Sequence, residues 1–335
     1  MPIPASGPLN FILIRDEFTG NDPIIFTQYY RGGPLVPDTP VNAAIPTAGE
    51  IGVGDFYGAE GATVLIIGSN QNNVDLSSLF GSEWTANTSK IALIQPGVTV
   101  GSTGSGTPSL SVPSNLVGQL QIKNNGNIFA AGGPGGTANP QGQSGNPGTP
   151  GGTALSISAP VTIDNQGSIY GGGGGGGAGG SGNGGSRFVS RTCRRTASGG
   201  GCDSCSCPYP NVTSCNNTGV RCRGGRGRIR TTSCFQDFEC GSPAPTSGGI
   251  GGAGGRGQGS NQTATNGSSG GGGGGGGAGS GGTGGPGSNF GLAGSPGNNS
   301  NNGGSGGAGG AAGNYVNGNS LVTWDNLGDV LGGAV

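Results

Sequence analysis

The pattern of apolar and polar positions predicts short β-strands over much of the first half of the chain. Residues 62–67 form a continuous apolar and β-branched run, and residues 91–94 and 98–100 form two shorter runs around a Gln-Pro-Gly turn. Apolar runs bounded by turn residues predict strands. Residues 74–80 predict one or two helical turns, with Asp75 near their start as a capping residue.

A longer unit occurs twice. Residues 120–129 and 161–170 each contain an alternating apolar run, an Asn-Asn-Gly or Asn-Gln-Gly sequence and a second apolar pair. A glycine-rich run begins at Gly132 after the first copy and at Gly171 after the second. A glycine that follows Asn between two apolar runs predicts a β-hairpin. A repeated unit is typical of stacked architecture. We therefore expect a β-rich domain over residues 61–131.

Residues 1–60 carry a shorter repeat of an aliphatic residue, an aromatic residue five positions later and a glycine two positions after that. The matching positions are Leu13, Phe18 and Gly20, then Ile25, Tyr30 and Gly32, then Ile51, Phe56 and Gly58. Such short units bury little apolar surface on their own. We interpret the segment as one that docks on a neighbouring protein; the alternative is a small irregular domain. The expected docking residues are Phe18, Tyr29, Tyr30, Phe56 and Tyr57.

Glycine accounts for 84 of the 335 residues, and 22 more are proline. Such a composition often indicates disorder, but residues 248–256 and 303–311 each contain three Gly-Gly-X triplets in register. This period matches polyglycine-II-type helices with about three residues per turn, whose bare edges allow lateral backbone hydrogen bonds. We predict a polyglycine-II sandwich over residues 132–186 and 248–335. The alternative is a flexible linker.

Residues 187–247 form an insert of different chemistry. It contains all eight cysteines of the chain: Cys193, Cys202, Cys205, Cys207, Cys215, Cys222, Cys234 and Cys240. Because the insert has few large apolar residues, it needs covalent staples, and we predict a disulfide framework. Eight cysteines allow on the order of a hundred pairings, and the sequence does not select one of them. The alternatives are free thiols, or zinc bound through Cys202, Cys205 and Cys207.

The same insert is rich in arginine. Its candidate ligand-binding residues are Arg194, Arg195, Tyr209, Arg221, Arg223, Arg226, Arg228 and Arg230. Guanidinium groups bind anionic sugars and phosphates through paired hydrogen bonds. The alternatives are a solvated basic face and a nucleic-acid site, and the net charge of −1 for the whole chain argues against nucleic acid.

Composition also excludes several kinds of function. The chain has no histidine, which rules out a histidine-based triad or a histidine-bound metal. The acidic residues form no suggestive catalytic pair, and Asp164 fits a turn position. We therefore expect no enzyme activity, and we also expect no metal or cofactor. No apolar run approaches the roughly 20 residues of a membrane span. The Pro-Ile-Pro-Ala sequence after Met1 predicts no signal peptide.

Several motifs are similar to those of a known class of virion proteins. Residues 14–18, 29–33 and 45–58 resemble the leader of many tailed-bacteriophage virion proteins. Residues 96–102 and 315–324, together with the Asn-Asn-Gly units, resemble glycine-rich phage tail-fibre and adhesin proteins. The resemblance covers nearly the whole chain except the cysteine-rich insert.

This resemblance implies a mostly irregular and β fold, in which a short β region leads into the polyglycine-II sandwich and the disulfide-rich insert. It implies a tail-fibre tip or adhesin, exposed to the medium on the virion tail, that recognises the host by binding. The expected partners are other tail proteins, through residues 1–60, and a host-surface glycan or outer-envelope protein, with homo-oligomers also expected. We expect the insert and the loops near 137–150, 260–269 and 288–302 to face the host.

In the family pattern such loops are shorter and poor in cysteine, so the insert leaves the receptor class open. Two other functions remain as alternatives. One is a structural virion decoration or baseplate-connector protein whose insert contacts neighbouring subunits. The other is a secreted ice- or surface-binding protein, against which the leader repeats argue.

Overall fold

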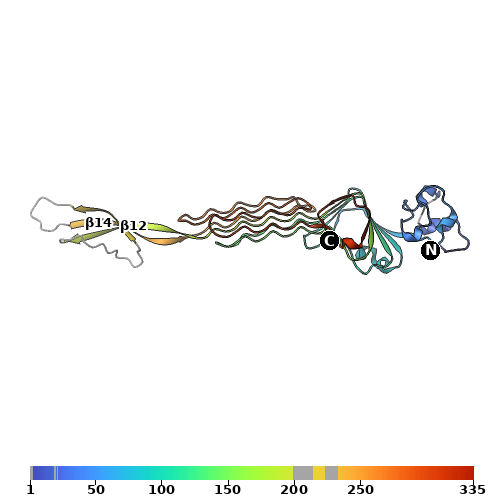
Figure 1. Cartoon of the computed structure of the whole chain (residues 1–335), viewed down its shortest axis with the longest axis horizontal. Coiled ribbons are helices and arrows are strands. Elements are labelled where there is room, and N and C mark those ends of the chain that lie inside the picture. The colour runs from blue at the N-terminus through green and yellow to red at the C-terminus, as the bar shows by residue number, and fades with distance from the viewer. Residues whose placement is uncertain (1–2, 19, 21, 199–213, 223–232) are drawn as a thin grey trace, which may run out of the picture.

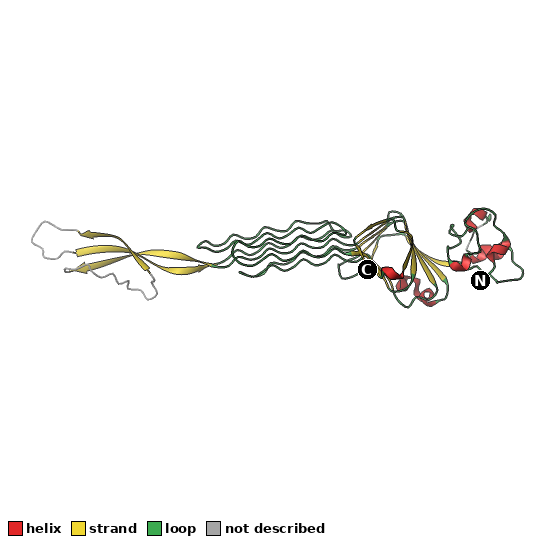
Figure 2. Ribbon diagram, viewed as in Figure 1, coloured by secondary structure: helices red, strands yellow, loops and turns green. Residues whose placement is uncertain are grey.

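The molecule is elongated and has four parts in a row (Figure 1). The computed structural model describes residues 3–18, 20, 22–198, 214–222 and 233–335, with the backbone alone for the described part of 188–243. A small N-terminal domain lies at one end and is followed by a β region. A bundle of extended glycine-rich segments comes next, and a small sheet lies at the other end (Figures 1 and 2).

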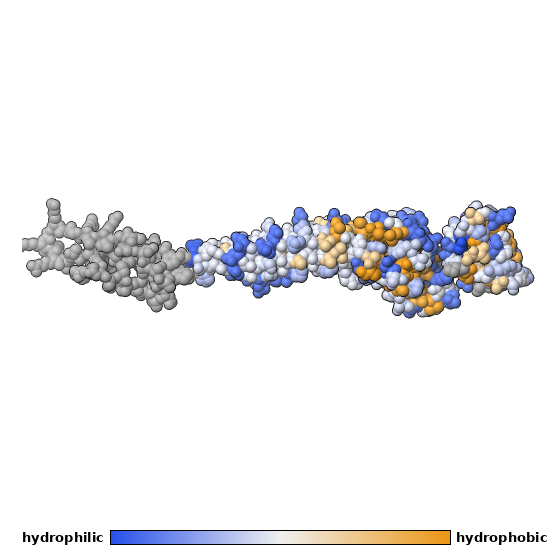
Figure 3. All heavy atoms as spheres, in the orientation of Figure 1, coloured by the Kyte–Doolittle hydropathy of each residue, from blue (hydrophilic) through white to orange (hydrophobic). Residues whose placement is uncertain are grey.

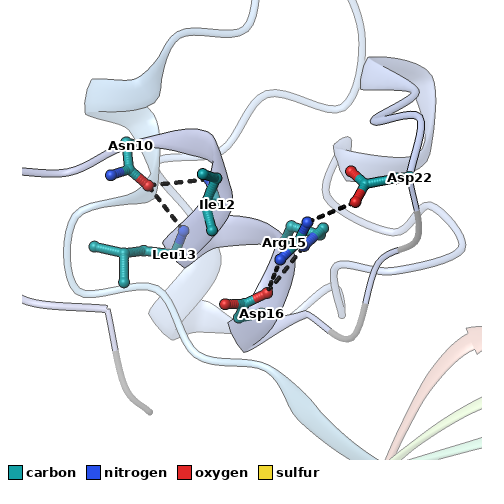
Figure 4. Close-up of polar contacts among 6 residues, drawn as sticks. All are labelled: Asn10, Ile12, Leu13, Arg15, Asp16 and Asp22. Atoms are coloured by element: carbon teal, nitrogen blue, oxygen red, sulfur yellow. Dashed lines mark hydrogen bonds and ion pairs between the residues drawn. The ribbon is translucent and has the colours of Figure 1, made fainter.

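The N-terminal domain consists of short helices joined by loops. They are α1 (Phe11–Glu17), η1 (Phe26–Tyr29), η2 (Pro40–Asn42) and η3 (Val53–Phe56). Asn10 caps α1, because its side-chain oxygen accepts the backbone N–H groups of Ile12 and Leu13 at 3.0 Å (Figure 4). Arg15, in the last turn of α1, pairs with Asp22 at 2.8 Å and so ties the helix to the loop that follows.

The β region is a three-sided parallel β-helix. In the described residues, three sheets of five strands each have the orders β1-β4-β7-β10-β16, β2-β5-β8-β11-β17 and β3-β6-β9-β15-β18. Every neighbouring pair is parallel. The chain visits the three sheets in turn, and each circuit adds one rung.

The strands are short, as the corners of such a coil require. The first sheet contains β1 (Ala62–Ile67), β4 (Ser89–Ile94), β7 (Gln119–Asn124), β10 (Val161–Asn165) and β16 (Val322–Asn326). The second contains β2 (Gln71–Asn72), β5 (Thr99–Gly101), β8 (Asn127–Phe129), β11 (Ser168–Tyr170) and β17 (Asp329–Leu331). The third contains β3 (Val74–Asp75), β6 (Leu110–Val112), β9 (Leu155–Ile157), β15 (Asn314–Asn317) and β18 (Gly333–Ala334).

Three short helices accompany the coil: α2 (Leu76–Phe80), η4 (Gly81–Thr85) and η5 (Asn319–Leu321). The strand expected at residues 62–67 is β1, and the helical turn expected after Asp75 is α2. The β region also extends beyond residues 61–131, because residues 155–170 and 314–334 complete its last rungs. The glycine-rich segments therefore leave the β-helix and return to it.

The prediction of two β-hairpins is wrong, although the prediction of a stacking repeat is correct. Strands β7 and β8 belong to different sheets, and each pairs in parallel with its counterpart in the second copy. Ile122 lies beside Ile163, and both are buried in the coil. The Asn-Gly sequence forms a corner, where the buried Asn124 side chain donates to Asn165 Oδ1 at 2.7 Å. Parallel pairing between rungs replaces the antiparallel pairing of a hairpin.

Glycine-rich segments leave the β-helix after β8 and after β11 and run side by side along the long axis (Figure 2). Apart from isolated bridges, neither helix nor strand is assigned within these described segments. Figure 3 shows hydrophobic residues gathered over the β-helix and the N-terminal domain, whereas the glycine bundle is pale or hydrophilic. The segments are 132–139, 143–153, 171–182, 247–258, 263–274, 278–288, 293–300 and 304–313.

Residues 171–182, the central segment, are all buried and hydrogen-bonded to six neighbouring segments. Every third N–H donates to the same neighbour, as those of Gly173, Gly176 and Gly179 do at 2.8 Å. The positions between them donate to two further neighbours, and three other segments donate to the carbonyls of the central segment. A Cβ atom at Gly176 would lie 1.9 Å from the carbonyl oxygen of Gly285. Only glycine fits at this position of the central segment.

Candidate functional site

The insert projects from the end of the glycine bundle that lies furthest from the N-terminal domain (Figure 1). Its strands are β12 (Gly185–Ser198), β13 (Ser214–Cys222) and β14 (Ser233–Thr246), in the antiparallel order β12-β14-β13. Strands β12 and β14 pair without interruption from Gly185 opposite Thr246 to Ser198 opposite Ser233. The central segment thus continues directly into a two-stranded stem that carries the insert outward.

Three of the predicted ligand-binding residues lie on these strands. Arg194 and Arg195 are on β12 and Arg221 is on β13. Arg194 lies opposite Asp237, whereas Arg195 lies opposite Gln236. Because neighbouring positions alternate between the two faces of a strand, Arg194 and Arg195 belong to opposite faces. The other candidates lie outside the described residues: Tyr209, Arg223, Arg226, Arg228 and Arg230.

Three turns of the glycine bundle surround the base of the stem, and we call them the collar. They are residues 139–143, 275–277 and 301–303. Ser186 donates its N–H to the carbonyl of Gly276 at 3.0 Å, and Asn183 donates to the carbonyl of Asn302 at 2.5 Å. Gly275, Gly276 and Gly277 all have positive φ, which favours glycine at this tight turn. The collar therefore fixes the point at which the insert begins.

Two turns expected to face the host lie instead at the β-helix end of the bundle: 259–262 and 289–292. Ser260 donates its N–H to the carbonyl of Ala130, directly after β8, at 2.9 Å. Phe290 packs against Tyr170 of β11, with ring centroids 5.5 Å apart. The expectation is wrong for these turns, because alternate connections of an up-and-down bundle lie at opposite ends.

The N-terminal docking residues also need a correction. Phe18, Tyr29 and Phe56 are 3%, 1% and 0% exposed and pack edge to face, with ring centroids 5.9 to 6.5 Å apart. Their side chains form the core of the domain and are not available to a neighbour. Tyr30 is half-buried and donates to the carbonyl of Gly49, whereas Tyr57 is 39% exposed.

The part of the chain that the structure describes contains no group of three or more His, Cys, Asp or Glu side chains placed to hold a metal ion. Among the same residues, none of the helices has the length and apolar character needed to cross a membrane. Cys202, Cys205 and Cys207 lie outside the described residues, and the other cysteines are described by backbone alone. The zinc and disulfide predictions for their side chains therefore stay predictions.

Comparison with known proteins identifies the class of protein. The family model of the phage tail fibre adhesin Gp38 matches residues 62–335, which span the β-helix, the glycine bundle and the insert. A solved structure, the gp37-gp38 adhesin tip complex of the bacteriophage S16 long tail fiber, is similar at 19% identity and a TM-score of 0.42. The match covers 97% of this chain and 93% of that chain. No curated protein matches the chain.

The chain is thus a phage virion protein of the host-attachment class. It belongs to the phage tail fibre adhesin Gp38 family. It recognises the surface of the host cell and is located on the virion tail, exposed to the surrounding medium. The family expected from the leader and glycine motifs is confirmed.

Proposed function

We propose that the glycine bundle is a polyglycine-II sandwich that serves as a stiff frame. Two observations support this: the three-residue rhythm of hydrogen-bond partners along the central segment, and the full burial of that segment. A polyglycine-II-type helix has about three residues per turn and no internal hydrogen bonds, so its N–H and C=O groups must find partners in neighbouring helices. The central helix has neighbours on every side and therefore needs small residues throughout.

We also propose that residues 1–60 attach the adhesin to other tail-fibre proteins. The domain has its own core and lies outside the family match, at the end of the molecule opposite the insert. Its surface exposes large apolar side chains, among them Ile12, Ile25 and Phe26 at 56%, 48% and 46%. A contiguous patch of exposed apolar side chains is typical of interaction sites, and these residues are the candidates for such a patch on the N-terminal domain.

At the other end, the insert and the collar bind the host receptor, and the adhesin acts by binding alone. The observation that carries this proposal is the position of the arginine-rich insert at the outermost end of the molecule. Guanidinium groups bind carboxylates and phosphates through paired hydrogen bonds. The expected receptor is an anionic host-surface glycan, or an outer-envelope protein with acidic groups.

Replacement of the insert tests this function. Ser186 and Pro245 lie opposite each other, so an Asn-Gly turn in place of residues 187–244 closes the stem as a two-residue hairpin. We expect the adsorption rate of virions to fall about a hundredfold, as when an interface loses its main contact residues. The number of adhesin copies per virion should be unchanged. Wild-type adsorption would contradict receptor binding by the insert, and a loss of adhesin from virions would indicate a structural role.

A further inference from the structure

The register of the insert places four of the eight cysteines opposite one another. Between β13 and β14, Cys215 lies opposite Cys240, and Cys222 lies opposite Cys234. These two strands contain no other cysteine. Each cysteine of either strand therefore has a cysteine as its cross-strand partner.

A bulge produces this match. The two cysteines of β13 are seven positions apart, whereas those of β14 are six apart. An irregularity between Asn217 and Val220 leaves one extra residue on β13 and brings the second pair into register. Positions six apart on β14 share one face of the sheet. Without the bulge, only one of the two pairs could be opposite.

We propose that Cys215–Cys240 and Cys222–Cys234 are disulfides that clamp β13 to β14. Residues opposite each other in an antiparallel pair have Cα atoms about 4.5–5.5 Å apart, and disulfides bridge Cα separations of about 4.4–6.8 Å. For each bridge, two S–H bonds break and one S–S bond forms. The two protons and two electrons pass to oxygen or to a small disulfide in the medium outside the host, where such bridges persist.

The remaining cysteines are then strongly constrained. Cys193 lies opposite Phe238, so β14 offers it no cross-strand partner. In a framework of four bridges, Cys193 would pair with Cys202, Cys205 or Cys207. The open pairings of the insert fall from on the order of a hundred to about three. This inference concerns the covalent structure of the insert and does not depend on what the insert binds.

A disulfide map of the full chain tests the proposal. The denatured protein is alkylated without reduction and cleaved with trypsin and with a protease that cuts before aspartate. The four cysteines then fall in different peptides: Cys215 in 203–221, Cys222 in 222–223, Cys234 in 231–236 and Cys240 in 237–256. We expect 222–223 to be joined to 231–236. We expect 237–256 to be joined to 203–221, with fragmentation locating the bond at Cys215.

Other maps overturn the proposal. They include a bond between 231–236 and 237–256, a bond between 222–223 and 203–221, or alkylation of all four cysteines. A pair of variants gives a second readout. Cys222→Ser should expose one thiol, in 231–236, whereas the control Cys193→Ser should leave 222–223 joined to 231–236. A free thiol in 237–256 of Cys222→Ser would contradict the pairing. Adsorption is not measured, so failure of the receptor proposal is distinguished from failure of this one.

Discussion

Asp75 is a residue whose charge state affects the stability of the fold. It caps α2 by accepting the backbone N–H of Ser78 at 3.1 Å, and it also accepts the hydroxyl of Ser77 at 2.5 Å. Burial by itself raises the pKa of Asp75, but hydrogen bonds from Ser77, Ser78 and Ser111 outweigh it and hold that pKa below its ordinary value. The carboxylate therefore stabilises the folded state.

The sign of the pH dependence follows from this lowered pKa. A carboxyl with a lower pKa in the folded state contributes stability above its unfolded pKa of about 4, and this contribution is lost as the pH falls through the folded value. We expect Asp75→Ala to lower the free energy of unfolding by about 1 kcal/mol at pH 7. The loss should shrink toward about pH 2, where Asp75 of the wild type is protonated and, like the alanine of the variant, carries no charge. Chemical denaturation at the two pH values measures it, and an equal loss at both would contradict the prediction.

The N-terminal aromatic repeat shows how far the burial of single residues can be predicted from the sequence. The repeat picks out Phe18 and Phe56, which were expected to dock but lie in the domain core, and it picks out Tyr30 where the structure buries Tyr29. Tyr29 is the last residue of the short helix η1 and Tyr30 is the residue after it, and adjacent side chains at such a helix end point in different directions. Only packing against Phe18 and Phe56 decides which of the two is buried. The local sequence cannot contain that information.

At the scale of elements, the glycine bundle makes a sharp prediction with a matched control. Gly176→Ala would place a methyl group 1.9 Å from the carbonyl oxygen of Gly285, whereas a Cβ atom at Gly272 meets nothing within 4 Å. We expect Gly176→Ala to destabilise the protein by about 3 kcal/mol or more. Gly272→Ala should be neutral or stabilising by about 0.5 kcal/mol. Thermal unfolding of both variants measures this, and equal effects would contradict lateral packing of the central segment.

The elements also show where a sequence pattern stops being informative. The Asn-Gly signal at residues 125–126 looks the same in a hairpin and in a β-helix corner, because it specifies only a turn. The choice depends on a partner such as Asn165, which lies 41 positions from Asn124. Uninterrupted glycine is no better guide to position: Gly171–Gly177 is fully buried, whereas the equally X-free run Gly270–Gly277 is mostly exposed. Only the contacts of the folded bundle decide which of the two runs is central.

At the scale of the whole molecule, the proposed function gives the two ends separate tasks. The β-helix and the N-terminal domain have separate hydrophobic cores, and the glycine bundle separates both from the insert. A change in the apolar surface of the N-terminal domain should therefore affect attachment to the virion without affecting the binding of host cells by the free protein.

Two isoleucines of similar exposure test this division. Ile25, on the N-terminal domain, is 48% exposed, and Ile250, on the glycine bundle, is 59% exposed. We expect Ile25→Asp to reduce adhesin copies per virion about tenfold, equivalent to about 1.4 kcal/mol of binding free energy. Ile250→Asp should leave the copy number unchanged. Immunoblots of purified virions measure both, and wild-type levels for Ile25→Asp would argue against docking through this surface.

The stem of the insert has a consequence for how such a protein diversifies. Gly185 and Thr246 are paired, so the chain departs from the frame and rejoins it at adjacent points. A segment grafted between neighbouring anchor points can change in length or be swapped outright while the scaffold keeps its geometry, since a longer loop adds little closure entropy. Under the proposed function, recombination at these two positions would give a phage lineage a route to new hosts in a single exchange.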